Sequence, residues 1–129
     1  MTDIKQLAAQ LRDGDEEARK QAAIALGKSG SPEAVPPLLA ALNDPLRSVR
    51  KAAHEVLIAT RDPRTIEPAI EAAAEGRLDF NAVAYSLERK FNVEDAYPRT
   101  WAALQNHGDA EIIAKARPAY ERWQKRQQT

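Results

Sequence analysis

The stretch that decides the fold is residues 11–37, which read LRDGDEEARKQAAIALGKSGSPEAVPP and return in altered form over residues 42–68 as LNDPLRSVRKAAHEVLIATRDPRTIEP. Eight positions are identical at a spacing of 31 residues, namely Leu11/Leu42, Asp13/Asp44, Arg19/Arg50, Lys20/Lys51, Ala22/Ala53, Leu26/Leu57, Pro32/Pro63 and Pro37/Pro68. Self-similarity at a fixed period of this length is typical of repeat architectures, in which each unit buries its apolar face against its neighbours. The repeat therefore predicts a chain built from stacked copies of one small unit.

The same period extends through four units, and each unit contains two apolar stripes. In the first stripe, residues such as Ile4, Ala8 and Leu11 are spaced i, i+4 and i+7, which places them on one face of a helix. The second stripe comprises Ala18/Val49/Phe80, Ala22/Ala53/Ala84 and Ala25/Val56/Leu87, and it returns one residue late in the fourth unit as Ile112, Ala116 and Ala119. Each unit is therefore expected to be a pair of helices.

These stripes and the turn residues between them predict eight helices. The expected spans are residues 3–12, 15–28, 32–42, 45–60, 63–75, 79–91, 97–105 and 109–126. Ser31-Pro32 and Asp62-Pro63 are typical of a helix N-cap followed by proline at the first helical position. Pro118 lies inside the last expected helix and should bend or interrupt it. We expect a single domain over residues 1–129, with repeats at about 1–30, 31–61, 62–92 and 93–129.

Composition and charge narrow the class of protein. Strong helix formers dominate and β-branched and aromatic residues are scarce, so we expect an all-α fold. The chain has no cysteine, which excludes disulfides and thiolate chemistry and is compatible with a cytoplasmic location. The formal net charge is zero, whereas a nucleic-acid-binding protein usually has a basic excess on one face. No apolar run approaches the ~20 residues of a membrane span, and the first residues lack a secretory pattern, so we expect a cytoplasmic protein with no membrane partner.

Two stretches of the chain resemble a known repeat family. Residues 13–27 read DGDEEARKQAAIALG, and residues 30–44 read GSPEAVPPLLAALND. They resemble HEAT repeats and are more narrowly similar to the PBS lyase HEAT-like subtype, with its Asp, Val-Arg, Ala-Ala, Ala-Leu-Gly and Ala-Val-Pro elements. The resemblance is strong over residues 4–73. It implies an α-solenoid of about four antiparallel helix pairs, which usually binds other proteins along its concave side.

The third and fourth units depart from the pattern of the family. Asn81 replaces the arginine of the motif, and Glu88 stands where Leu26 and Leu57 stand in the first two units. These departures are compatible either with a functional change or with capping of the last repeats.

Three prolines fall inside expected first helices, where proline removes a backbone donor and clashes with the preceding turn. They are Pro36, Pro37 and Pro68. The family resemblance implies a first helix bent at proline, so we keep these helices and predict a kink in each.

Four charged residues recur at fixed repeat positions and are expected to be structural. They are Asp13 and Asp44 with Arg19 and Arg50. A ladder of Asp and Arg at these positions would tie each interhelical turn to the next unit, and a carboxylate at a helix start is independently favourable. Removing Arg50 should therefore destabilise the fold and not abolish an activity.

The sequence contains no pattern that indicates catalysis. His54 and His107 are the only histidines, and neither has a second metal ligand at a suitable spacing. We expect each to be a solvated or capping residue. The serines lack a nucleophile motif, and no glycine-rich phosphate loop is present. We therefore predict no catalytic residue, no metal ligand and no cofactor.

A surface for a protein partner is expected on the second helix of each pair. The residues opposite the buried stripes form a mixed polar surface with two apolar members, and those we predict to contact a partner are Glu17, Lys20, Ile24, Lys51, Glu55, Tyr85 and Arg89. Apolar and aromatic anchors surrounded by polar groups are typical of interface centres. Single exposed apolar residues are also ordinary on protein surfaces, so this assignment is a hypothesis.

The last expected helix contains both cations and aromatic residues. Residues 115–126 include five basic groups, one acid, Tyr120 and Trp123. Interleaved aromatic and basic side chains can bind nucleic acid. Tyr120 and Trp123 share one helix face with Ile112 and Ala116, however, so we predict that the two rings seal the last repeat.

Three functions from different classes remain open. The preferred one is a small non-enzymatic module, expected to be monomeric, that binds another protein. The alternative, suggested by the resemblance alone, is an accessory or subunit-like protein of phycobilin lyase or phycobilisome chemistry. The third is a HEAT-like DNA-binding module, which is disfavoured because Glu17 and Glu55 offset the nearby Lys20 and Lys51.

Overall fold

The computed structural model describes residues 3–129, and these contain eight α-helices, three short 3-10 helices and no strand. The α-helices are α1 (Ile4–Asp13), α2 (Glu16–Ser29), α3 (Val35–Ala40), α4 (Arg47–Thr60), α5 (Ile66–Ala74), α6 (Phe80–Lys90), α7 (Ala96–His107) and α8 (Ala110–Gln127). The 3-10 helices are η1 (Pro32–Ala34), η2 (Ala41–Asn43) and η3 (Pro63–Thr65). All eight expected helices are present, which confirms the predicted all-α fold.

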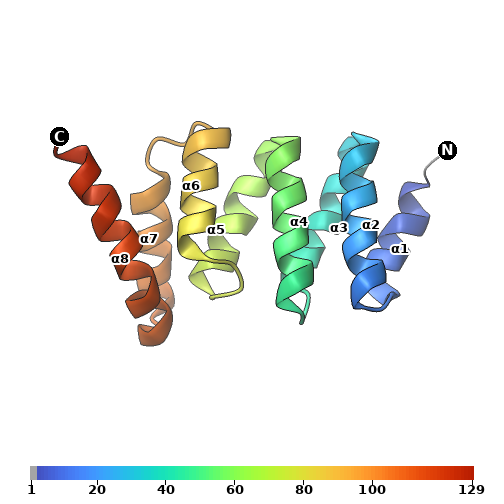
Figure 1. Ribbon diagram of the computed structural model, residues 1–129, viewed down its shortest axis with the longest axis horizontal. Coiled ribbons are helices and arrows are strands. Elements are labelled where there is room, and N and C mark those ends of the chain that lie inside the picture. Colours follow the sequence, from blue (N-terminus) through green and yellow to red (C-terminus); the bar gives the residue numbers. More distant parts are fainter. Residues whose placement is uncertain (1–2) are drawn as a thin grey trace. The chain divides into compact units, whose positions relative to one another are not determined.

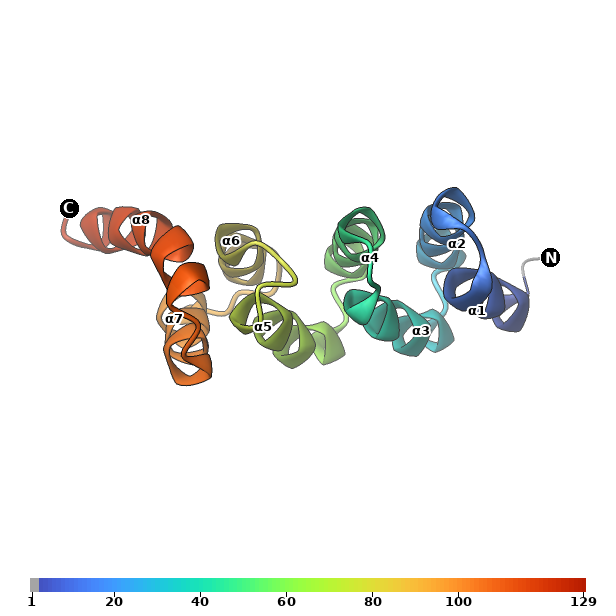
Figure 2. The ribbon, with the colours of Figure 1, turned by 90° about the horizontal axis from the view of Figure 1, so that it is seen from below.

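The chain forms two compact units, of which the first ends at Pro68 and the second is Ala69–Thr129. Helix α5 begins in the first unit and ends in the second. In the first unit, α1 packs on α2, α3 packs on α4, and α2 lies beside α4 (Figures 1 and 2). In the second unit, α6 packs against α7 and α8, which also pack on each other. Helix pairs therefore stack within each unit as in an α-solenoid.

The second helices of the first two repeats, α2 and α4, end with the same hydrogen bonds. The Ser29 hydroxyl donates to the carbonyl of Leu26 at 2.6 Å and accepts the Ser31 N–H at 3.2 Å. Thr60, 31 positions later, donates to the carbonyl of Leu57 at 2.7 Å and accepts the Asp62 N–H at 3.3 Å. The hydroxyl thus satisfies a terminal carbonyl of each helix and fixes the turn that follows.

One of the three repeated positions of the first stripe is buried in every unit, whereas the stripe residues Ile4, Ala8, Leu39 and Ile66 are half-buried. Leu11, Leu42, Ala73 and Leu104 are each at most 3% exposed. This position could be predicted because all four residues lie one full period apart on the face that each first helix turns towards the core.

The second stripe needs correction at several positions, since Ala18, Ala25, Val56 and Ile112 are only half-buried. Next to Ala25 and Val56, Leu26 and Leu57 are fully buried. At 3.6 residues per turn, the seventh and eighth positions after a buried residue both lie near its face, and the larger leucine occupies the core. In α6 the core position is taken by Leu87, as predicted.

The predicted kinks take the form of a change in helix type. η1 leads into α3 and η3 leads into α5. Pro36, Pro37 and Pro68 then lie in the first turn of the α-helical part. A missing N–H costs little there, because the first N–H groups of a helix have no intrahelical acceptor.

Pro118 was expected to bend or interrupt the last helix; α8 runs through it without a break, so the interruption does not occur. The residues after Pro118 are held by aromatic packing on α7. Trp101 stacks on Tyr120 with ring centroids 4.8 Å apart, and Tyr97 stacks on Trp123 at 5.6 Å. This packing holds the half of the helix after Pro118 on α7, and it confirms that Tyr120 and Trp123 pack on the last repeat.

Phe80 adds two edge-to-face contacts to this aromatic cluster, at 5.9 Å from Tyr97 and 6.0 Å from Trp101. Two arginines of α8 lie over rings of this cluster. Arg117 is 5.4 Å from the Trp101 centroid, and Arg126 is 5.7 Å from that of Tyr97. Rings that already stack on one another and on arginine have few free faces for nucleic-acid bases, which weakens the DNA-binding alternative.

The two residues of the third unit that depart from the repeat motif, Asn81 and Glu88, both accept hydrogen bonds from this aromatic cluster. Asn81 Oδ1 accepts a hydrogen bond from the Tyr97 hydroxyl at 2.8 Å. Glu88 Oε2 accepts one from Trp123 Nε1 at 3.1 Å. Tyr and Trp need a hydrogen-bond partner for their polar atoms when they are buried, and the two substitutions supply these partners to the aromatic cluster.

Candidate functional site

Arg19 and Asp44 link the first two repeats. Arg19 Nε lies 3.0 Å from Asp44 Oδ2, and Arg19 Nη2 donates to Asp44 Oδ1 at 3.2 Å. Arg19 Nη1 also donates to the carbonyl of Gly14 at 2.9 Å. The two side chains are only 18% and 9% exposed. The pair therefore joins the turn between α1 and α2 to the turn between α3 and α4.

The other two residues of the predicted ladder have different surroundings. Arg50 Nη1 donates to the carbonyls of Asp44 and Pro45, at 2.7 and 3.0 Å, and so binds the turn of its own repeat. Asp13 is exposed and pairs with its neighbour Arg12 at 3.2 Å. Within the described residues, Asp13 therefore makes no contact of the kind that joins Asp44 to Arg19.

Five of the predicted partner-binding residues lie together in the first unit, on what we call the α2–α4 face: Glu17, Lys20 and Ile24 of α2 with Lys51 and Glu55 of α4. Lys20 is half-buried and the other four are exposed. Lys20 and Lys51 are equivalent repeat positions on two helices that pack side by side, as are Ile24 and Glu55. Repetition therefore places these side chains on one surface of α2 and α4, and their contact with a partner stays a prediction.

The remaining two predicted residues lie on α6 in the second unit. Tyr85 is 51% exposed, and the guanidinium carbon of Arg89 is 5.6 Å from its ring centroid. This cation–π contact holds both side chains on one exposed patch.

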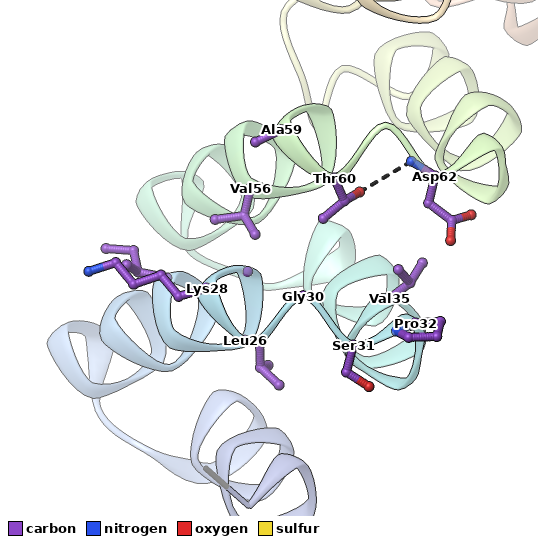
Figure 3. Close-up of a pocket in the computed structure, with 12 residues that line it drawn as sticks. Leu26, Lys28, Gly30, Ser31, Pro32, Val35, Val56, Ala59, Thr60 and Asp62 are labelled. Carbon is purple, nitrogen blue, oxygen red and sulfur yellow. Dashed lines mark hydrogen bonds between the residues drawn. The ribbon is translucent and has the colours of Figure 1, made fainter. Parts of the chain in front are cut away.

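A groove opens between the ends of α2 and α4, and Ile24 of the α2–α4 face lines it. Its volume is about 560 Å³, and its lining is mainly apolar. Ile24 and Pro32 line it on one side, and Val56 and Ala59 on the other. In Figure 3 the Val56 side chain points from α4 towards α2, whereas Leu26 points away. The groove is thus an apolar surface bounded by two parallel helices.

Two of the polar side chains that line the groove, those of Ser31 and Asp62, cap helix ends. Ser31 Oγ accepts the Glu33 N–H at 3.2 Å, and Asp62 Oδ1 accepts the Arg64 N–H at 2.9 Å. The Arg64 side chain binds the Asp62 carboxylate at 2.9 Å, which lowers the pKa of that carboxyl group, and also reaches the carbonyl of Pro32 at 3.0 Å. This arrangement suits a docking surface more than a reactive centre, because the oxygens of Ser31 and Asp62 serve as caps.

Sequence reasoning found Ile24 but missed the rest of the groove. Gly27 lies where α2 approaches α4, and a methyl group built there would overlap Val56 Cγ1. A glycine inside a predicted helix signals a close approach of another element. That signal was available in the sequence, but it does not reveal that an open groove lies beside the contact.

His54 is not the solvated or capping residue that we expected. It is 5% exposed on α4, and its Nε2 makes no hydrogen bond. Burial lowers the pKa of His54 to about 4, so the ring is neutral at pH 7. The expectation failed because His54 lies next to Ala53 on the buried side of α4, where repeat-equivalent Ala23 is also buried.

Residues 3–129 contain no group of three His, Asp or Glu side chains placed to hold a metal ion. His107 is exposed in the last turn of α7. None of the helices in this part of the chain combines the length and apolar character that crossing a membrane requires.

The profile of a protein family described as HEAT repeats matches residues 4–88, which is about two thirds of the chain. The match covers the first unit, including the α2–α4 face and the groove, and continues through most of α6. Neither a curated protein nor a solved structure matches the chain.

Proposed function

The chain belongs to the HEAT-repeat family, and we propose that it is a non-enzymatic module that binds another protein on its second helices. Repeats of this family generally mediate interactions between proteins. The observation that carries the proposal is the apolar groove of about 560 Å³ beside Ile24. An apolar cavity bordered by charged side chains is what the centre of an interface requires.

The exposed charged side chains around Ile24 support a role in binding another protein and not a role in catalysis. Glu17 Oε2 lies 3.8 Å from Lys20 Nζ and its Oε1 accepts a hydrogen bond from Gln21 at 2.9 Å. Side chains that pair with neighbours on an open helix face can form the polar rim of an interface. Tyr85 and Arg89 supply a second contact in this proposal, since aromatic residues and arginine are frequent at the energetic centres of interfaces.

The experiment that tests this function is site-specific photo-cross-linking in cells. A photoreactive phenylalanine analogue is placed at Ile24, at Tyr85 or, as a control, at Gln10, which is exposed on the first helix α1. We expect the same protein to be cross-linked from Ile24 and Tyr85 and not from Gln10. Cross-linking of that protein mainly from Gln10, or of no protein from Ile24, would contradict the proposed surface.

A further inference from the structure

The groove beside Ile24 is too large for one side chain. Its volume is about 560 Å³, whereas a cavity of about 150 Å³ holds a benzene molecule. It lies between the ends of two helices that pack side by side, α2 and α4, and Ile24, Val56 and Ala59 line it. A protein segment that fills this groove must therefore present several apolar side chains on one side.

The polar side chains of the groove offer few partners for the backbone of a bound segment. Among the described residues, those that line it are Lys28, Ser31, Thr60 and Asp62. Thr60 donates to the carbonyl of Leu57 and accepts the Asp62 N–H (Figure 3), and the oxygens of Ser31 and Asp62 cap helix ends. An extended segment would leave most of its own N–H and C=O groups unpaired here, whereas a helix pairs these groups internally.

Two other modes of peptide binding need features that are not found at this groove. Addition of a strand requires the edge of a sheet, and residues 3–129 contain no strand. Recognition of a proline-rich segment requires a groove lined by aromatic side chains, and none of the described residues that line this groove is aromatic. Among the modes that bury apolar side chains, an amphipathic helix laid into the groove remains.

The charged side chains beside the groove carry both signs. Lys20 lies 3.8 Å from Glu17 on α2, and Lys51 lies one helical turn before Glu55 on α4. A surface of this kind does not select a segment of one net charge. It complements a helix whose flanks carry both acidic and basic residues beside an apolar stripe.

We propose that the groove binds an amphipathic α-helix of another protein, which inserts large apolar side chains three or four positions apart beside Ile24 and Val56. This inference rests on the proposed function and names the form of the partner segment. The apolar stripe of the helix gains from leaving water, and the helix brings no unpaired backbone group from its middle into the groove.

The test starts from a phage library of random 16-residue peptides selected on the full chain. We expect the enriched peptides to carry large apolar residues at positions i, i+3 or i+4, and i+7. The binding of one fluorescein-labelled enriched peptide is then followed by anisotropy. Proline in place of a polar residue in the middle of this peptide should weaken binding at least about tenfold, because it breaks a helix, whereas alanine at the same position should change the affinity less than about twofold.

Two variants of the chain test whether the peptide lies in the groove. Ile24→Glu and Ala59→Trp should each weaken binding at least about tenfold, since they put a charge or a bulky ring where the apolar side chains insert. Ala102→Trp is the matched control, because Ala102 is also an exposed alanine in a helix but lies on α7 in the second unit. This control should change the affinity less than about twofold, since its ring lies away from the groove.

The possible outcomes separate this inference from the proposed function. Peptides that need Ile24 but tolerate the proline would overturn the helix and leave the proposed function standing, whereas peptides indifferent to both Ile24→Glu and Ala59→Trp would overturn both. The lack of any selected peptide would overturn the inference alone, because cross-linking from Ile24 decides the proposed function independently. A dimer of the free chain in sedimentation velocity that Ile24→Glu dissociates would assign the groove to a second copy and would also overturn the inference.

Discussion

At the scale of single residues, the first two repeats depend on a guanidinium group that spans two turns. Arg19 satisfies a carbonyl of its own turn and the carboxylate of Asp44 in the next repeat. A charged pair this well buried is costly to break, because the partner left behind keeps its charge without water. The recurrence of Arg and Asp at a fixed period thus has a structural cause.

Arg19→Ala should lower the free energy of unfolding by about 2–4 kcal/mol, since it leaves the Asp44 carboxylate without its main cation in a site that is 9% exposed. Arg12→Ala is the control, because its pair with Asp13 is 71% and 68% exposed and should contribute less than about 1 kcal/mol. Urea denaturation followed by far-UV circular dichroism measures both. Equal losses in the two variants would contradict the role given to Arg19.

His54 predicts a specific dependence of stability on pH. The folded chain protonates His54 near pH 4, whereas an unfolded histidine does so near 6.5. The stability contributed by neutral His54 is therefore complete above pH 6.5 and is lost progressively as the pH falls to about 4. The loss is of the order of 3 kcal/mol.

His54→Leu should remove this part of the pH dependence, because leucine has no proton to bind. Denaturation curves at pH 7, 6, 5 and 4 for both chains isolate the effect from that of the carboxylates, which both chains share. An unchanged difference in stability between the variant and the natural chain across this range would show that His54 is not buried in neutral form.

At the scale of helices, the repeat decides what can be predicted. Positions that recur every 31 residues, such as Leu11, Leu42 and Leu104, give the buried face directly. The choice between adjacent Ala25 and Leu26 could not be made from periodicity, because both lie near the same helix face. The aromatic cluster was only partly predictable, since the hydrogen bonds of Asn81 and Glu88 to it depend on where α8 packs.

The candidate site, too, could be predicted only in part from the sequence. The α2–α4 face could be predicted because it is the opposite side of a repeated stripe. The groove could not, because its shape depends on the distance between α2 and α4 and on the side chain directions of Val56 and Ile24, which no repeat pattern states.

Gly27→Ala tests the close approach of these two helices. Alanine favours a helix more than glycine does, but its methyl group would overlap Val56, so we expect a net destabilisation of about 1–2 kcal/mol. The double variant Gly27→Ala/Val56→Ala should recover part of that loss relative to the sum of the single variants. A stabilising Gly27→Ala would show that the helices are not in this contact.

At the scale of the whole molecule, we propose that residues 1–129 are a single domain that unfolds cooperatively, although the chain divides into two compact units. Helix α5 is shared by both units, so unfolding one unit alone would also break this helix. Trp101 and Trp123, the two tryptophans, both lie in the second unit and report on it selectively.

The expected result is that tryptophan fluorescence and far-UV circular dichroism give the same urea transition, because the dichroism signal comes from helices of both units. Two transitions, or a fluorescence midpoint separated from the dichroism midpoint, would show that the units unfold independently and would refute the single domain.

The central claim is that this chain acts by docking a segment of another protein on the α2–α4 face. Amide hydrogen exchange of the full chain, with and without the partner captured from Ile24, tests it most directly. We predict slower exchange in residues 17–28 and 47–60 and no change in α1. Slower exchange confined to α1 and α3, or no change in α2 and α4 at a saturating partner concentration, would contradict the claim.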